Sequence, residues 1–193
     1  MEFDAKGQTI QENYLRMVQL ITPRPIAWVS TLSLDGVANL APFSFFTGVG
    51  ANPPTLCFAP ANQPDGSAKD TLENIRRTGE FVVNLVTEDL GLAMHRSAED
   101  VAPEIDEFKL VGVTEAESIR VQPPRVLESA AAMECTLHSV VTLGTGPGGA
   151  NLVIGNVQYF HLRDGLENEK ALPTVARVGR REYLQVQKTF RYE

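Results

Sequence analysis

Two segments of this chain gather the side chains that a phosphate-bearing ligand would need. The first covers residues 22–50 and the second covers residues 69–85. Hydroxyl groups and one ammonium group in these segments can donate hydrogen bonds to a phosphate. The donors are Ser30, Thr31, Ser44, Lys69 and Thr71. Because the chain as a whole is acidic, any anionic ligand must be held locally by such a set.

The same segments carry groups suited to a flat heterocycle. Asn39 and the backbone amides near Ala41 and Ser44 can hydrogen bond to the edge of a ring. Flat apolar walls come from Trp28, Phe43, Phe45 and Phe46. The alternative is purely structural, because serines near strand ends and phenylalanines at alternating positions are usually turn and core residues.

Lys69, Asp70 and Thr71 stand at the beginning of a predicted helix. In the structural alternative, Asp70 is only the N-cap of that helix. Even then, the first helical turn leaves backbone amides free at the positive end of the helix dipole. A phosphate could bind there in either case.

The spacing of apolar residues predicts the elements that must hold these groups. Residues 10–21 form one amphipathic helix, which Pro23 and Pro25 end. Strands are expected over 24–31, 37–41, 44–49 and 55–59, with a turn at 33–36 and an interruption at Pro42. A loop over 61–67 leads into the helix that begins near Lys69 and ends at Gly79.

The second half of the chain predicts a central strand and a long hairpin. Residues 81–86 form the central strand, 88–97 are helical, and 98–124 are loop-rich, which we interpret as a lid or a dimer arm. Two long strands over 131–143 and 152–162 follow, and residues 173–193 are polar and short. About seven strands with two or three peripheral helices predict a mainly β, antiparallel barrel in one domain, residues 1–193, rather than alternating βαβ units.

The composition narrows the classes of function. A formal net charge of −7 and a pI near 5.0 argue against binding to nucleic acid or to an anionic membrane surface. No basic or apolar leader begins the sequence, and no apolar run is long enough to span a bilayer, so we expect a cytoplasmic protein. Cys57 and Cys135 form no CxxC motif, and the three histidines have no metal-ligand spacing, so we expect no metal site.

One glycine motif imitates a dinucleotide-binding fingerprint. Residues 144–149, GTGPGG, match GxGxxG letter for letter. The fingerprint requires a helix after the glycine turn, whereas the NLVIGNVQYF that follows here is typical of a strand. We therefore interpret the motif as the loop of the hairpin.

Seven short motifs in order give the chain a resemblance to a known family. They are PRPIAWVST, NLAPFSFF, NPP at 52–54, KDTLENI with GEFVVNL, IDEF at 105–108, GNV in a late strand, and RVGRREY near the end. On these motifs, from about residue 13 to residue 183, the sequence resembles the flavin reductase-like family. That family includes flavoredoxin and the reductase components of two-component flavin monooxygenases.

The resemblance implies an FMN-binding split β-barrel of Greek-key type, usually a homodimer, with the flavin near the subunit interface. It implies phosphate and ribityl contacts from the hydroxyl and lysine set, and a border for the isoalloxazine ring from the segment after Asn39. The cofactor-binding residues it implies are Trp28, Val29, Ser30, Thr31, Asn39, Ala41, Pro42, Ser44, Phe45, Phe46, Lys69, Asp70, Thr71 and Tyr183. For Trp28 a core role is an equal alternative.

The C-terminal motif matches the family at Arg177, Gly179 and Tyr183. The family often has a second glycine after Gly179, but this chain has Arg180 and Arg181 there, which alters the mouth of the implied site. Glu107 and His161 are expected to have ordinary structural roles, even if they lie near the site.

The resemblance implies an NAD(P)H:flavin oxidoreductase, with FMN bound and with NADH or NADPH as the donor. Since the flavin carries the difficult step, no catalytic acid or base is expected. The sequence leaves two alternatives open. One is a flavoredoxin-like electron carrier that receives electrons from a protein donor, and the other is a barrel that stores flavin or binds another aromatic ligand. A partner monooxygenase is a further expectation.

Overall fold

A computed structural model describes residues 1–169 and 171–185 of the chain. Its N-terminal half contains η1 (Ala5–Gly7), α1 (Ile10–Leu20), β1 (Arg24–Pro25), β2 (Ala27–Leu32), β3 (Ala38–Phe43), β4 (Phe46–Ala51), β5 (Pro54–Phe58), α2 (Asp70–Thr78) and β6 (Glu80–Asn84). Its C-terminal half contains η2 (Glu88–Leu90), α3 (Gly91–Arg96), α4 (Glu107–Val111), β7 (Glu115–Ala116), β8 (Arg125–Val126), β9 (Ala131–Thr142), β10 (Asn151–Leu162), β11 (Val175–Val178) and β12 (Glu182–Gln185).

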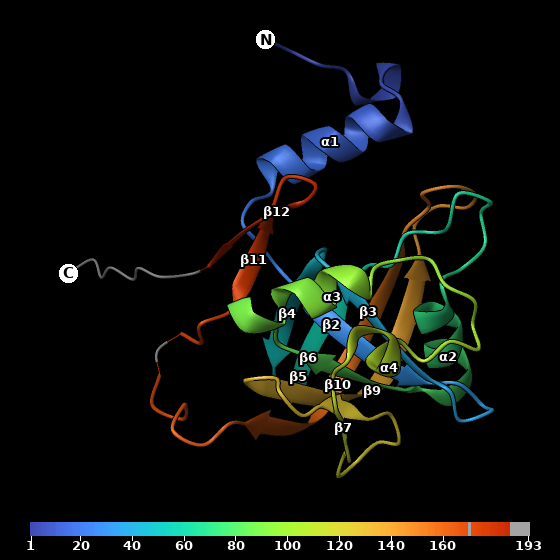
Figure 1. Cartoon of the computed structure of the whole chain (residues 1–193). Helices are drawn as coiled ribbons and strands as arrows, with labels where there is room; N and C mark the ends of the chain where they lie inside the picture. The colour runs from blue at the N-terminus through green and yellow to red at the C-terminus, as the bar shows by residue number, and fades with distance from the viewer. Residues whose placement is uncertain (170, 186–193) are drawn as a thin grey trace.

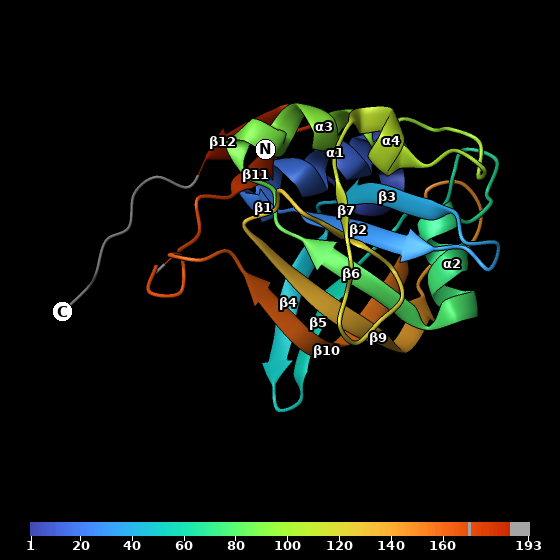
Figure 2. The ribbon, with the colours of Figure 1, turned by 60° about the horizontal axis from the view of Figure 1, so that its bottom comes forward.

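Seven antiparallel strands form the main sheet, in the order β3-β2-β6-β9-β10-β5-β4 (Figures 1 and 2). Strands β3 and β4 lie at opposite edges of this sheet, yet only residues 44 and 45 connect them. Two residues span only about 7 Å, so the sheet must curl until its two edges meet. The result is the predicted barrel with a split between β3 and β4, and crossing connections of the Greek-key type.

The predicted central strand and long hairpin are confirmed. Strand β6 pairs with β2 on one side and with β9 on the other. Strands β9 and β10 pair along their length, and the glycine-rich residues 144–149 lie in the loop between them. No helix follows those glycines, so the interpretation of the GxGxxG motif as a hairpin loop is correct.

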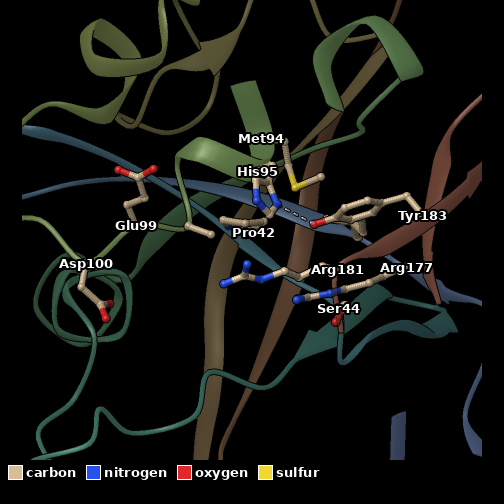
Figure 3. A pocket seen from close by; sticks show the side chains of 11 residues that line it. Pro42, Ser44, Met94, His95, Glu99, Asp100, Arg177, Arg181 and Tyr183 are labelled. Atoms are coloured by element: carbon tan, nitrogen blue, oxygen red, sulfur yellow. Dashed lines mark hydrogen bonds between the residues drawn. The ribbon is translucent and has the colours of Figure 1, made fainter. Parts of the chain in front are cut away.

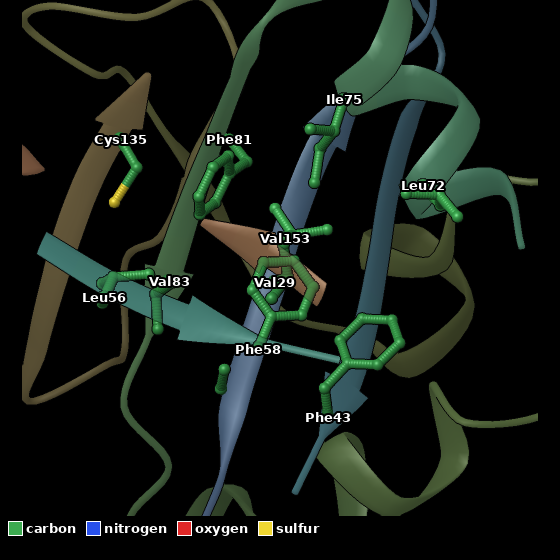
Figure 4. Packing of buried hydrophobic residues seen from close by; sticks show 11 residues of the cluster. Val29, Phe43, Leu56, Phe58, Leu72, Ile75, Phe81, Val83, Cys135 and Val153 are labelled. Atoms are coloured by element: carbon green, nitrogen blue, oxygen red, sulfur yellow. The ribbon is translucent and has the colours of Figure 1, made fainter. Parts of the chain in front are cut away.

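Three phenylalanines lie at the centre of the barrel core (Figure 4). The rings of Phe43 and Phe58 lie 5.1 Å apart between centroids, and those of Phe58 and Phe81 lie 5.5 Å apart. Phe81 packs directly against Gly155, where a Cβ atom would overlap its ring. The glycine of the GNV motif is therefore required by packing.

Three details differ from the sequence-based expectations. Strand β3 continues through Pro42, because it is an edge strand and the imide nitrogen of Pro42 faces away from β2. Helix α4 lies in the segment expected to be loop, between its N-cap Asp106 and Gly112, which has a φ of 74°. The polar C-terminal region forms the β11–β12 hairpin, while residues 186–193 of that prediction lie outside the described residues.

Two smaller sheets complete the described structure. Strands β1, β11 and β12 form one of them, and β7 and β8 form the other. Helix α1 lies outside the main sheet, beside the β11–β12 hairpin (Figure 1). Among the described residues, none of the helices has the length and apolar character needed to cross a membrane.

Candidate functional site

Strand β2 places four of the predicted site residues in the interior, namely Trp28, Val29, Ser30 and Thr31. Trp28 is fully buried, and its Nε1 donates to Ser97 Oγ over 2.8 Å. Val29 belongs to the barrel core, and the buried Ser30 hydroxyl donates to the carbonyl oxygen of Pro124. None of the four lines either cavity described below. Ligand contacts from these residues remain a prediction.

Two adjoining cavities lie along the edge strand β3. The smaller, of about 300 Å³, lies between β3, the beginning of α2 and α4. The larger, of about 520 Å³, lies between the β3–β4 corner, α3 and the β11–β12 hairpin (Figure 3). Both are lined by Pro42, Ala98, Glu99, Asp100 and Arg177. The shared wall makes them one recess at the split of the barrel.

The recess brings together eight of the predicted site residues. Its smaller part is lined by Asn39, Ala41, Pro42, Lys69, Asp70 and Thr71, and its larger part by Pro42, Ser44 and Tyr183. Phe45 and Phe46 line neither part. The Phe45 ring is partly exposed, and the guanidinium carbon of Arg24 lies 6.0 Å from its centroid.

The exposed edge of β3 offers backbone groups to the recess. The N–H of Leu40 points away from β2, because it donates to Glu107 Oε2 over 3.0 Å. Since alternate residues of an antiparallel strand face the same side, the backbone of Pro42 faces away from β2 as well. Pro42 has no N–H to leave unpaired, so this edge presents carbonyl acceptors to a ligand.

Helix α2 begins at the recess without a side-chain cap. Its N-cap is Lys69, whose side chain caps no backbone amide, so the alternative in which Asp70 is the N-cap is wrong. Lys69 Nζ instead donates to Asp100 Oδ1 over 2.9 Å. The two side chains are 35% and 67% exposed, so this ion pair is weak and can exchange for another anion. Burial raises the pKa of Asp70, and the charge of Lys69 only partly opposes this.

A buried hydrogen-bond network lies behind the smaller cavity. The hydroxyls of Thr71 and Thr31 both donate to Asn39 Oδ1, over 2.7 Å and 3.2 Å. Asn39 Nδ2 then donates to Glu107 Oε1 over 2.9 Å. The network fixes the orientation of the Asn39 amide and uses one of its two N–H groups. Thr31 thus supports the recess from behind.

The larger cavity is closed by contacts between α3 and β12. The Nδ1 atom of His95 lies 3.2 Å from the hydroxyl of Tyr183, and the two rings meet edge to face (Figure 3). The Ser44 hydroxyl accepts from Nε of Arg24 over 3.4 Å. Polar groups therefore lie on both sides of this cavity.

Arg24 is a buried cation that links three segments around the recess. Its guanidinium donates to the carbonyls of Val18 and Ile21 at the end of α1, and to the carbonyl of Gly179 in the β11–β12 turn. Burial lowers the pKa of Arg24, the charge of Tyr14 opposes this, and the charge of Arg177 lowers it further. Arg24 therefore fixes the hairpin that bears Arg177 and Tyr183.

Sequence reasoning missed Arg24 and His95 and gave Glu107 only an ordinary structural role. Glu107 lines the smaller cavity, at the beginning of α4. Asp106 and Gly112 were the available signal for that helix, since an aspartate N-cap and a glycine C-cap are typical of helix ends. His161 lies in the wall of a separate cavity, beside Glu134.

The donors of the recess fit a phosphate and a heterocycle. Ammonium, guanidinium and hydroxyl groups suit the first, and the carbonyl edge of β3 with the Asn39 amide suits the second. Within residues 1–169 and 171–185, no group of three or more His, Cys, Asp or Glu side chains could hold a metal ion. Binding of an organic anion is the chemistry that this donor set supports.

Comparison with known proteins gives four informative matches. The profile of the flavin reductase like domain matches residues 19–184. An uncharacterized protein of Halalkalibacterium halodurans is 36% identical over 198 residues, covering 98% of this chain and 94% of the relative. Nitrilotriacetate monooxygenase component B from Bacillus cereus is 30% identical, with a TM-score of 0.94 over 100% of this chain and 98% of that one. A split-barrel flavin reductase structure from Shewanella frigidimarina, 22% identical, superposes with a TM-score of 0.85 over 100% of this chain and 98% of that one, which supports the fold.

Proposed function

This chain belongs to the flavin reductase-like domain family, and from that premise we propose that it binds FMN and transfers a hydride to it from NADH or NADPH. The family supports a flavin oxidoreductase in general. FMN as the particular flavin and a nicotinamide as the donor are our proposal. We also propose that residues 1–193 act as one domain, in keeping with a profile that matches residues 19–184.

The observation that carries the proposal is the uncapped beginning of α2. An N-cap position favours Ser, Thr, Asp or Asn, and the positive end of a helix dipole disfavours a cation. Lys69 occupies that position, with no side-chain cap. A local rule broken in this way is typical of a functional site. A phosphate would bind the free amides and the ammonium group together.

Two sets of groups in the recess would bind different parts of FMN. Lys69 and the α2 amides would hold the phosphate, while Asn39 and the Pro42 carbonyl would border the ring. FMN, when bound, would supply the two-electron acceptor for the hydride. The protein then needs only to hold the ring and admit the nicotinamide to within about 3.5 Å of it. This division requires no nucleophile and no metal.

Spectroscopy of the purified protein tests the proposal directly. We expect FMN to bind with a perturbed visible spectrum, and we expect anaerobic NADH or NADPH to bleach it. Steady-state oxidation of both donors with added FMN gives the rate. If neither donor supports turnover and FMN stays bound through gel filtration, the protein is a flavoredoxin-like electron carrier and not a reductase. Absence of FMN binding would contradict both the reductase and the electron carrier.

We propose in addition that the protein is a homodimer in the cytoplasm and that a monooxygenase can accept its reduced flavin. Two features support a dimer. The outer strand β4 is exposed along most of its length, and α1 with its C-cap exposes Leu15, Met17, Leu20 and Ile21. Exposed apolar side chains on an edge strand and a helix favour association. Light scattering after gel filtration checks the mass, and a monomer would contradict this part.

A further inference from the structure

The arginines after Gly179 form a basic corner in the larger cavity. Arg177 and Arg181 both line it, and Figure 3 shows their side chains reaching into it from the hairpin side. In a chain of net charge −7, two guanidinium groups in one wall are a local reversal of charge. Arginine is also the side chain best suited to bind a phosphate with two hydrogen bonds.

The two arginines differ in how far they are already engaged. Arg177 donates from Nε and Nη2 to the carbonyl oxygen of Arg180, which holds the turn. Within the described residues, the guanidinium of Arg181 has no hydrogen bond and no ion pair within 4.0 Å. Arg181 therefore has all its donors available to a ligand.

The acidic groups of this cavity lie on its opposite side. Glu99 and Asp100 lie across the cavity from the arginines in Figure 3, and Asp100 is paired with Lys69. Glu182 caps the turn, because its carboxylate accepts from the backbone N–H groups of Arg180 and Arg181. None of these carboxylates forms an ion pair with the Arg181 guanidinium within the described residues. The backbone N–H of Arg181 and, to a smaller extent, the charge of Arg177 lower the pKa of the Glu182 carboxyl, so the Arg181 guanidinium is the less compensated of the two.

We infer that Arg181, with Arg177, binds a phosphate of the dinucleotide electron donor. This inference rests on the proposed function, since it names how that donor is held. Lys69 lines only the smaller part of the recess and Arg181 only the larger part. The recess thus has two anion sites, one for the flavin at α2 and one for the donor at the β11–β12 turn. The donor phosphate is either the 2′-phosphate of NADPH or the diphosphate shared with NADH.

Calorimetric titration of the FMN-loaded protein with 2′,5′-ADP and with ADP tests the inference without turnover. We expect Arg181→Gln to weaken nucleotide binding by about tenfold or more, through loss of charge-assisted hydrogen bonds. The matched control is Arg180→Gln, which removes the same charge from the same turn at an exposed side chain that does not line the cavity. The control should change affinity by less than about threefold, since a charge outside the cavity acts only through screened solvent.

Comparing the two nucleotides shows which phosphate of the donor Arg181 binds. A loss confined to 2′,5′-ADP assigns Arg181 to the 2′-phosphate and predicts a preference for NADPH. A loss with both ligands, or with ADP alone, assigns it to the 5′ phosphates that NADH and NADPH share. Equal losses in the two variants, or no nucleotide binding by the wild-type protein, would overturn the inference. A fall in FMN affinity in Arg181→Gln would also overturn it, because the corner would then hold the flavin. If the wild-type protein binds these nucleotides but reduces no flavin, the proposed function fails and the anion site stands.

Discussion

Two buried glutamates, one in the wall of the recess and one outside it, show how differently this fold treats a carboxylate. Glu107 lies beside the recess and accepts hydrogen bonds from Asn39 Nδ2 and the Leu40 N–H. Glu134, on β9, accepts from the backbone N–H groups of Ile119 and Arg120 and faces Nε2 of His161. The side chain of Glu134 is completely buried, and Glu107 is 5% exposed.

The pKa values of the two groups shift in opposite directions. Burial raises the pKa of Glu107, and the nearby Asp70 raises it further, so that the hydrogen bonds from Leu40 and Asn39 do not compensate. Burial also acts to raise the pKa of Glu134, but the hydrogen bonds from His161, Ile119 and Arg120 together lower it below its usual range. Burial acts to raise the pKa of both carboxyls, and the hydrogen bonds and the charge of His161 outweigh it only at Glu134.

This difference distinguishes Glu134, which acts as a structural clamp, from Glu107, which forms part of the wall of the site. Glu134 fastens the segment around residues 119 and 120 to β9, and its charge is fully compensated there. Glu107 orients the Asn39 amide, but its charge is poorly compensated beside Asp70. The ionised carboxylate is therefore destabilised at Glu107, in the recess, and stabilised at Glu134, outside it. Such locally unfavourable interactions are typical of functional sites.

The largest expected effect is the loss of stability in Glu134→Ala. Removing the carboxylate leaves two backbone N–H groups and His161 without their acceptor, and we expect the free energy of unfolding to fall by about 3–5 kcal/mol. Urea denaturation followed by Trp28 fluorescence measures it. Glu107→Ala is the matched comparison, with an expected loss of about 1–3 kcal/mol, because its ionised form is less favourable in the fold. Equal losses would remove the distinction between clamp and site wall.

A second effect concerns binding. We expect Lys69→Ala to weaken FMN affinity by about 1–3 kcal/mol, because a charge-assisted hydrogen bond to the phosphate is lost. Its folding stability should change by less than about 1 kcal/mol, since the pair with Asp100 is exposed. Fluorescence titration of FMN gives the affinity. Asp100→Asn is the control, as it frees the ammonium group and should leave FMN binding equal or tighter. Unchanged affinity in Lys69→Ala would make the lysine an ordinary surface residue.

The barrel could be predicted because its signals are local. Alternating residues define β2, β9 and β10, and a glycine with a φ of 72° ends α2 where the sequence places it. Eight of the predicted site residues also line the recess. Seven of them lie in motifs at β3, at the β3–β4 corner and at the beginning of α2, and Tyr183 lies on β12. Short-range patterns of this kind survive folding unchanged.

The remaining parts of the site depend on contacts between residues that are distant in sequence. Arg24 donates to Gly179, 155 residues later, and His95 meets Tyr183, 88 residues later. No periodicity reports such pairs. The same limit applies to Ser30, whose hydroxyl donates to the carbonyl oxygen of Pro124, 94 residues later, a partner that the sequence does not indicate. A polar residue in a strand reveals its role only when its partner is known.

The smallest expected effect concerns how stability depends on pH, and it tests the two glutamates with isosteric variants. A group with a lowered folded pKa stabilises the protein above its unfolded pKa, near 4.5, and loses that contribution as the pH falls. The difference in stability between wild type and Glu134→Gln should therefore shrink below about pH 4.5. A group with a raised folded pKa stabilises the protein below about pH 4.5 and loses that contribution as the pH rises through the folded value.

For Glu107→Gln the difference from wild type should accordingly shrink, or change sign, as the pH rises above about 4.5. Urea denaturation at steps from about pH 3.5 to about pH 7 measures both differences, each with a slope of at most about 1.4 kcal/mol per pH unit for one proton. Slopes of the same sign would mean that the two carboxylates share one environment. Opposite slopes would place the unfavourable charge at Glu107. A phosphate bound at Lys69 would add a negative charge nearby and raise the folded pKa of Glu107 further. FMN should therefore steepen the Glu107 slope and leave the Glu134 slope unchanged.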